Sequence, residues 1–107
     1  MKLLNTVLKE VSKEGKVKFP VMTKREFLET PIETLELDAR SNNALKRTKI
    51  NTIKDLLNNL NEIPHIRGCG TKSVSRIMYR ICTYYYGNLS EQERMSYLKE
   101  IIQLNKQ

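Results

Sequence analysis

The sequence lacks the features of a membrane or secreted protein. No run of apolar residues reaches the roughly 18 that a spanning helix needs. The amino-terminal residues have neither the apolar core nor the small-residue cleavage site of a secretory signal. Cysteine is scarce, and Cys69 and Cys82 cannot build a disulfide framework. We therefore expect a cytoplasmic protein with no membrane contact, in which both cysteines remain thiols and act as small hydrophobic residues.

Acidic residues are scarce in the middle of the chain. The 107 residues carry a formal charge of +7, yet basic and acidic residues balance over residues 1–39 and over residues 83–107. Residues 40–82 hold nine basic residues against only Asp55 and Glu62. Like charges held together destabilise a compact state unless a partner neutralises them. This segment is therefore expected to bind a polyanion, although a merely solvated surface would have the same composition.

The apolar residues recur mainly at helical spacing, which predicts an all-α fold. Residues 16–22 alternate briefly, but Pro20 favours an extended connector there. Capping-box patterns at Thr23, Thr30 and Ser90 predict three helix starts, with Pro31 at the first helical position of the second. The other predicted elements are a helix over residues 3–14, a helix from residue 40 to about Lys49, one starting at Thr52, one over residues 71–86, and a final helix over residues 91–105.

Residues 66–77, Ile-Arg-Gly-Cys-Gly-Thr-Lys-Ser-Val-Ser-Arg-Ile, contain two glycines just before a predicted helix. Such a turn tolerates positive φ and directs the amides of the first helical turn toward an anion. Lys72 and Ser73 add a cation and a hydroxyl beside those amides. The string resembles the helix-hairpin-helix motif of sequence-tolerant DNA-binding proteins. A helix-connecting turn without a ligand is the plain alternative.

A longer resemblance covers residues 31 to about 80. It joins residues 31–47, with the helix start Arg40-Ser41-Asn42-Asn43, to residues 50–57 and to the stretch Gly70-Thr71-Lys72-Ser73. These stretches resemble the C-terminal domain of the bacterial RNA polymerase alpha subunit. The resemblance implies a compact helical domain that binds the minor groove of A·T-rich DNA and touches sigma factor and activators.

The resemblance also implies residue roles. Arg40 would enter the minor groove beside Asn43, while Gly70, Lys72 and Ser73 would hold phosphates; a narrow A·T groove concentrates negative potential that attracts arginine. The residues expected to contact DNA are Arg40, Asn43, Lys46, Arg67, Gly68, Gly70, Lys72, Ser73 and Arg76, and those expected to face a protein partner are Glu33, Glu36 and Asp38.

The sequence departs from the family at several positions. Ala44 stands where the family often has cysteine, Gly68 where it often has asparagine, and Arg76 where it often has an acid. Arg76 is expected to strengthen nonspecific attraction to DNA. Thr34 replaces an acid in the stretch that contacts sigma factor. The large assembly domain of the alpha subunit has no counterpart, so an accessory, stand-alone role is expected.

Few residues suit catalysis or metal binding. DNA glycosylases of the hairpin type use a lysine where Lys72 stands, but they need an aspartate downstream, and Asp38 and Asp55 both lie upstream. His65, the only histidine, stands beside Pro64 without a set of ligands. We therefore expect no enzyme activity, no metal and no cofactor. The tyrosines of residues 84–86 are expected to pack in the protein, with stacking on bases as the alternative.

The predicted organisation has three parts. Residues 1–30 form a helical extension and connector, residues 31–86 form the DNA-binding domain, and residues 87–107 form a helix that packs on this domain or on a partner. The expected function is binding of double-stranded DNA by a nucleoid-associated transcription protein. The alternative is a module that docks on sigma factor, an activator or an RNA polymerase subunit. The terminal helices also offer a surface for dimerisation.

Overall fold

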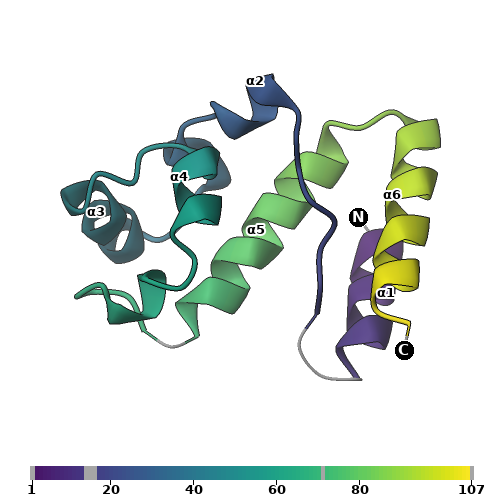
Figure 1. The fold of residues 1–107 in the computed structure, drawn as a ribbon, viewed down its shortest axis with the longest axis horizontal. Coiled ribbons are helices and arrows are strands. Elements are labelled where there is room, and N and C mark those ends of the chain that lie inside the picture. Colours follow the sequence, from purple (N-terminus) through teal and green to yellow (C-terminus); the bar gives the residue numbers. More distant parts are fainter. Residues whose placement is uncertain (1, 14–16, 71, 107) are drawn as a thin grey trace. The chain divides into compact units, whose positions relative to one another are not determined.

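The computed structural model describes residues 2–13, 17–70 and 72–106, and the regular elements in these ranges are helices (Figure 1). The predicted all-α fold is confirmed. Within the same ranges, no helix is long and apolar enough for a membrane span. The elements are α1 (Lys2–Ser12), α2 (Arg25–Leu28), the 3-10 helix η1 (Ile32–Leu35), α3 (Ala39–Arg47), α4 (Ile53–Asn58), the 3-10 helix η2 (Ile63–His65), α5 (Ser73–Gly87) and α6 (Glu91–Leu104).

The protein divides into two compact units. The central unit, Thr23–Cys82, holds the elements from α2 to η2 and the first part of α5. The terminal unit joins Met1–Met22 to Thr83–Gln107 and holds α1, the last turn of α5 and α6. The segment rich in basic residues therefore falls in the central unit.

Short elements build the central unit, and backbone hydrogen bonds join them. An isolated antiparallel bridge pairs Pro31 with Thr52. On either side of it, the Ile32 amide donates to the Asn51 carbonyl and the Ile53 amide donates to the Thr30 carbonyl, both at 3.0 Å. This bridge ties the start of η1 to the start of α4. The largest fully buried apolar side chains of the unit are Ile32, Leu45, Ile53, Leu56, Ile63, Ile77, Ile81 and Cys82.

Two of the predicted capping boxes are wrong. The N-cap residue of α2 is Lys24 rather than Thr23, and that of η1 is Pro31 rather than Thr30; neither residue makes a side-chain cap bond. The Thr30 hydroxyl donates instead to the Glu26 carbonyl at 3.1 Å, at the end of α2. A hydroxyl that satisfies the end of one helix is not available to begin the next.

Two helix starts do carry capping boxes. The Ser90 box is confirmed, since the Glu93 amide donates to the Ser90 hydroxyl and the Ser90 amide donates to the Glu93 carboxylate. A box that the sequence pattern did not predict begins α4, where Thr52 and Asp55 exchange the same pair of bonds. Its third residue is aspartate instead of the usual glutamate or glutamine. The predicted stop at Gly15 lies outside the described residues.

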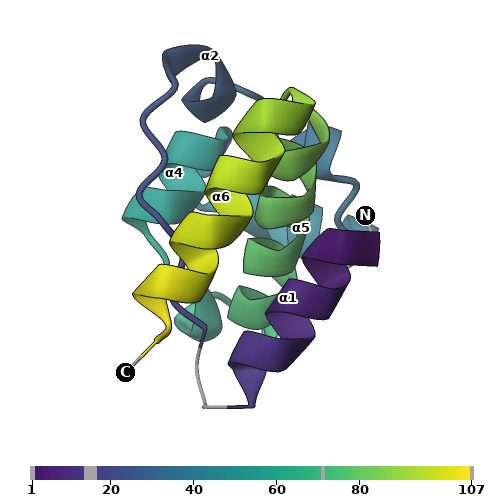
Figure 2. The same ribbon diagram turned by 90° about the vertical axis from the view of Figure 1, so that its right-hand side faces the viewer.

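In the terminal unit, α1 and α6 pack against each other (Figure 2). Their buried side chains include Leu4 and Ile101. The Asn105 side chain accepts from the Lys18 amide and donates to the Lys18 carbonyl, each at 2.8 Å, which fastens the connector to the end of α6. Tyr85 packs beside Tyr97 with ring centroids 5.0 Å apart, as expected for a packing role.

Candidate nucleic-acid interface

The first turn of α3 places Arg40 on the surface of the central unit. Asp38 is the N-cap residue, and its carboxylate accepts from the Ser41 amide at 2.7 Å and from the Ser41 hydroxyl at 3.2 Å. These two hydrogen bonds lower the pKa of the Asp38 carboxyl below its ordinary value. Because the cap fixes where the helix begins, it also fixes the position of Arg40 two residues later.

One face of α3 carries two arginines with a small residue between them. Arg40, Asn43, Ala44 and Arg47 follow the i, i+3, i+4, i+7 spacing, which brings side chains to a common helix face. Arg40, Asn43 and Arg47 each leave part of their surface to solvent, whereas Ala44 is fully buried. A small side chain at the centre of this face lets another segment approach the helix closely.

The two-glycine turn is the segment that approaches. Gly68 has a φ of +101°, and a Cβ atom on it would lie 3.0 Å from the Cβ of Ala44 and 3.9 Å from the carbonyl oxygen of Arg40. Both the dihedral angle and the contact require glycine at this position. Gly70 differs, because a Cβ there would meet nothing within 4 Å and its φ lies outside the left-handed region.

Arg47 also holds this turn, and this residue is not among those predicted to bind DNA. Its Nη2 atom donates to the carbonyl oxygen of Arg67 at 3.2 Å. The same nitrogen would lie 3.5 Å from a Cβ on Gly68. An arginine seven positions after Arg40, with Ala44 between them, is the only sequence signal for this arrangement.

The start of α5 follows the turn directly. Ser73 is only 2% exposed; its amide donates to the Gly70 carbonyl at 3.1 Å and its hydroxyl donates to the same oxygen. The hydroxyl therefore faces the turn rather than solvent. Lys72 is exposed beside it, and Thr71 lies outside the described residues.

The three acids expected to face a protein partner all have partners within the protein. Glu33 forms an ion pair with Lys46, a residue expected to contact DNA. Glu36 pairs with Arg80 at 3.4 Å, and Asp38 caps α3. Lys46 does not share the i, i+3, i+4, i+7 spacing of the face that holds Arg40, and its charge is partly balanced by Glu33.

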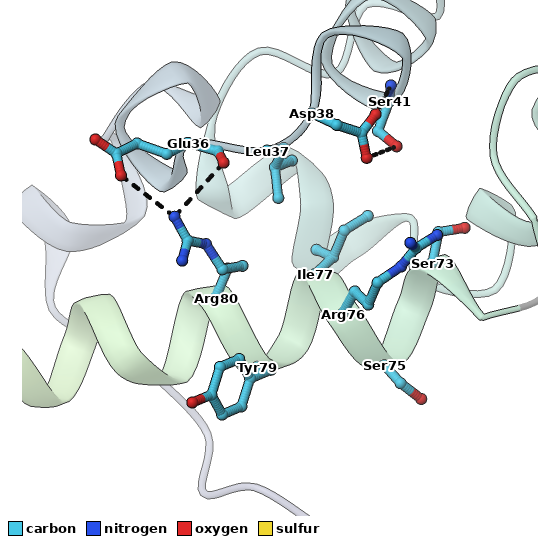
Figure 3. Close-up of a pocket in the computed structure, with 10 residues that line it drawn as sticks. All are labelled: Glu36, Leu37, Asp38, Ser41, Ser73, Ser75, Arg76, Ile77, Tyr79 and Arg80. Carbon is cyan, nitrogen blue, oxygen red and sulfur yellow. Dashed lines mark hydrogen bonds and ion pairs between the residues drawn. The ribbon is translucent and has the colours of Figure 1, made fainter. Parts of the chain in front are cut away.

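A groove of about 480 Å³ runs beside the first turns of α5 (Figure 3). Figure 3 shows Arg76 and Ile77 on the side of α5 toward Asp38 and Ser41, while Arg80 reaches Glu36. The positive charge of Arg76 adds a smaller contribution to the lowered pKa of Asp38. The lining residues are Glu36, Leu37, Asp38, Ser41, Ser73, Ser75, Arg76, Ile77, Tyr79 and Arg80.

Cys69 lies among the charged residues of this surface. Burial raises the pKa of its thiol above the ordinary value, and the negative charge of Asp38 acts in the same direction, whereas Arg40 and Arg47 act against it. The thiol is thus within electrostatic reach of both arginines of α3. In the described part of the protein, no cluster of three or more histidine, cysteine or acidic residues could hold a metal ion.

The structure therefore brings α3 and the turn together: the Ala44 side chain and the Arg40 backbone oxygen lie close to Gly68, and Arg47 donates to the Arg67 carbonyl. Gly70, Lys72 and the buried Ser73 continue the same turn into α5, and Arg76 lies within electrostatic range of Asp38, the cap of α3. Asn43 shares the helix face of Arg40. Lys46 lies outside this face.

Residues 21–81 match the family of the C-terminal domain of the bacterial RNA polymerase alpha subunit. Three curated relatives are DNA-directed RNA polymerase subunits alpha. The protein from Desulforudis audaxviator is 41% identical over 59 residues, which are 54% of this chain and 19% of the relative. That from Syntrophomonas wolfei is 47% identical over 55 residues, 50% of this chain and 17% of the relative. That from Oenococcus oeni is 46% identical over 52 residues, 48% of this chain and 17% of the relative.

The protein thus spans less than a fifth of the length of these relatives. No solved structure gives a significant match to it.

Proposed function

Because the protein belongs to the family of the C-terminal domain of the bacterial RNA polymerase alpha subunit, we propose that it binds double-stranded DNA, without catalysis, through phosphates and an A·T-rich minor groove. The observation that carries the proposal is the contact between α3 and the two-glycine turn. It brings the backbone of the first turn of α3, which carries Arg40, close to Gly68 within the segment that contains the excess of basic residues.

In this proposal, the exposed side chain of Arg40 enters the minor groove, with Asn43 beside it. In the minor groove A·T and T·A present the same acceptors, whereas G·C adds the guanine amino group, so the groove separates A·T from G·C pairs. The narrow width and negative potential of an A·T-rich groove would add to this preference. Lys72 and Gly70 contact the phosphate backbone, where an exposed cation and an uncrowded backbone let a phosphate come close. The buried Ser73 would contribute indirectly, because its hydroxyl donates to the Gly70 carbonyl and so keeps the turn in place.

The remaining charges play a supporting part. Arg67 and Arg76 are exposed and would add phosphate attraction at the turn and along the groove. Lys46 would contribute least, because Glu33 already balances part of its charge. All these residues lie within residues 31–86, which we propose as the DNA-binding domain, with residues 1–30 and 87–107 as its accessory segments.

The relatives are subunits of RNA polymerase, so we propose a transcription-associated protein of the nucleoid. DNA binding is favoured over docking on sigma factor or another protein, because Glu33, Glu36 and Asp38 already have partners in their own chain.

Fluorescence anisotropy with an A·T-rich and a G·C-rich duplex at several salt concentrations tests this proposal. The affinity should fall with salt, with a slope near −0.9 per phosphate neutralised. Arg40→Ala should weaken binding by roughly 1–3 kcal/mol and reduce the A·T preference, whereas Lys72→Ala should weaken binding to both duplexes alike.

The matched control is Arg25→Ala. Arg25 belongs to α2, outside the proposed surface, where it pairs with Glu29 at 3.2 Å. Its replacement should leave both affinities nearly unchanged. A wild-type protein that shows no salt-dependent binding at low ionic strength would exclude DNA binding and leave the docking module as the better explanation.

A further inference from the structure

Arg47 combines a fixed position with donors that the turn does not use. One of its guanidinium nitrogens donates to the Arg67 carbonyl at 3.2 Å and lies over Gly68. A guanidinium carries several N–H donors in a planar fork. In the described part of the protein, the Arg67 oxygen is the acceptor that Arg47 reaches, and the side chain remains exposed. The rest of the fork is therefore available to an external anion.

Along α3, Arg40 precedes and Arg47 follows the contact of Ala44 with the turn. They occupy positions i and i+7 of α3, so their Cα atoms are separated by a helical rise of about 10 Å. The contact between Ala44 and Gly68 lies between them. Both positive charges also lie within electrostatic range of the Cys69 thiol in the turn.

This spacing separates the roles of the two arginines on a duplex. The minor groove of B-DNA is about 6 Å wide. With Arg40 inside the groove and α3 lying across it, a residue whose Cα atom is about 10 Å further along the helix stands beyond the groove wall, where the phosphate backbone runs. A planar fork suits a phosphate there, because it forms two parallel hydrogen bonds.

We propose that Arg47 is a further DNA-binding residue, which holds the two-glycine turn with one N–H group and contacts a backbone phosphate with the others. This inference rests on the proposed function and extends it. The turn is then bound to α3 by the same side chain that meets the phosphate, so DNA contact and turn geometry are linked through one residue.

Three variants separate the charge of Arg47 from its hold on the turn. Arg47→Gln removes the charge and keeps an amide donor, and Arg47→Lys keeps the charge but loses the planar fork. Arg25→Gln is the matched control on α2. For Arg47→Gln we expect the salt slope to become shallower by about 0.9, the value for one phosphate contact. Arg47→Lys should keep the slope and bind several-fold more weakly than wild type, and Arg25→Gln should match wild type.

The salt slope distinguishes a phosphate contact from a purely structural role. A variant that only loosened the turn would lose affinity without losing a whole phosphate from the slope. Circular dichroism and thermal unfolding verify that each variant is folded. If Arg47→Gln does not fold, the Nε–Hε resonance of Arg47 in wild type provides the test. It should shift on addition of duplex, as that of Arg40 should, while that of Arg25 stays in place.

Each outcome bears on the inference. A folded Arg47→Gln variant with the wild-type slope, or an Arg47 resonance that the duplex does not move, overturns it. If Arg40→Ala still weakens binding in the same assay, the proposed function stands and only the role of Arg47 is lost. A wild-type protein without salt-dependent binding overturns both.

Discussion

The two units of this protein differ in the interactions that stabilise each of them internally. In the terminal unit, α1 and α6 are 11 and 14 residues long and pack through amphipathic faces. In the central unit, α2, α3 and α4 have 4, 9 and 6 residues. Helices this short are marginal by themselves in water. They depend on caps, on the Pro31–Thr52 bridge and on side-chain bonds to backbone carbonyls.

The difference shows what the polar residues of the central unit contribute. Arg47 donates to the Arg67 carbonyl and Arg80 donates to the Leu35 carbonyl at 2.8 Å, so two cations are used to position backbone segments. The terminal unit has comparable bonds from Arg94 to the Tyr86 and Gly87 carbonyls, each at 3.0 Å, which join the end of α5 to α6. Arginine side chains thus position backbone segments in both units, and in the central unit one of them, Arg47, holds the turn of the proposed DNA surface.

The largest expected effects on the free energy of unfolding come from substitutions that create a cavity in the core of one unit and leave the core of the other unit intact. Ile53 in α4 and Ile101 in α6 are both fully buried. Truncation of either to alanine should reduce the free energy of unfolding by about 2–5 kcal/mol, from lost apolar burial and the cavity that remains. We expect Ile53→Ala to weaken DNA binding and Ile101→Ala to leave the affinity of the folded protein near that of wild type.

Urea unfolding, hydrogen exchange and anisotropy together check this prediction. Exchange should accelerate mainly in the unit that carries the substitution. Equal loss of DNA affinity in both variants, measured where both remain folded, would show that the terminal unit contributes to binding as much as the central unit does.

A smaller effect should distinguish the two glycines of the turn. Gly68→Ala adds a methyl group 3.0 Å from the Cβ of Ala44, at a φ of +101°. We expect a loss of about 1–3 kcal/mol in stability together with weaker DNA binding. Gly70→Ala meets no neighbour within 4 Å, so its stability should change by less than about 0.5 kcal/mol.

The effect of Gly70→Ala on DNA binding sharpens the comparison. A methyl group at an uncrowded backbone position beside Lys72 would stand between that backbone and a phosphate, so affinity should fall although stability does not. Thermal unfolding and anisotropy on both variants measure the two quantities separately. Wild-type affinity for Gly70→Ala would show that no phosphate approaches the turn at this residue.

The helices with long apolar stripes could be predicted from the sequence for a simple reason. In α5 and α6, burial of one face decides the structure, and the periodicity of that face is visible in the residues themselves. The Ser90 box added a second, independent signal at the start of α6. The short elements do not combine a long apolar stripe with a second signal of this kind. Thr30, with Pro31 and Glu33 after it, fits the sequence pattern of a helix start, yet its hydroxyl donates to the Glu26 carbonyl at the end of the preceding helix.

The glycine turn of the site could be predicted from the sequence, because a positive φ strongly favours one residue type. The residues whose role depends on a tertiary contact could not. The positive φ at position 68 requires glycine, and the two-glycine pattern of Gly68 and Gly70 indicates this turn from the residues alone. The role of Arg47 depends on a bond to a backbone carbonyl 20 residues away, which has no residue-type signature. The pairing of Lys46 with Glu33 was hidden for the same reason, because it joins two elements that only the fold brings together.

The smallest expected effect concerns the acid beside the proposed DNA surface. Asparagine is as good an N-cap as aspartate, so Asp38→Asn should keep the start of α3 and remove a negative charge two residues from Arg40. We expect DNA affinity to rise about two- to fivefold at low salt, and the gain to fade as salt screens the charge. An affinity that stays the same or falls would show that Asp38 lies too far from the phosphates to repel them.

The pH dependence of stability provides the complementary measurement. The lowered pKa of Asp38 means that folding favours its charged form, so the stability it contributes is present above the ordinary value of 3.8 and is lost as the pH falls through the folded value. Asp55 behaves in the same way and is unchanged in the variant. Between about pH 6 and about pH 3, Asp38→Asn should therefore lose less unfolding free energy than wild type. Parallel curves for the two proteins in urea unfolding would mean that the cap of α3 does not depend on the charge, and that the Ser41 bonds alone set the position of Arg40.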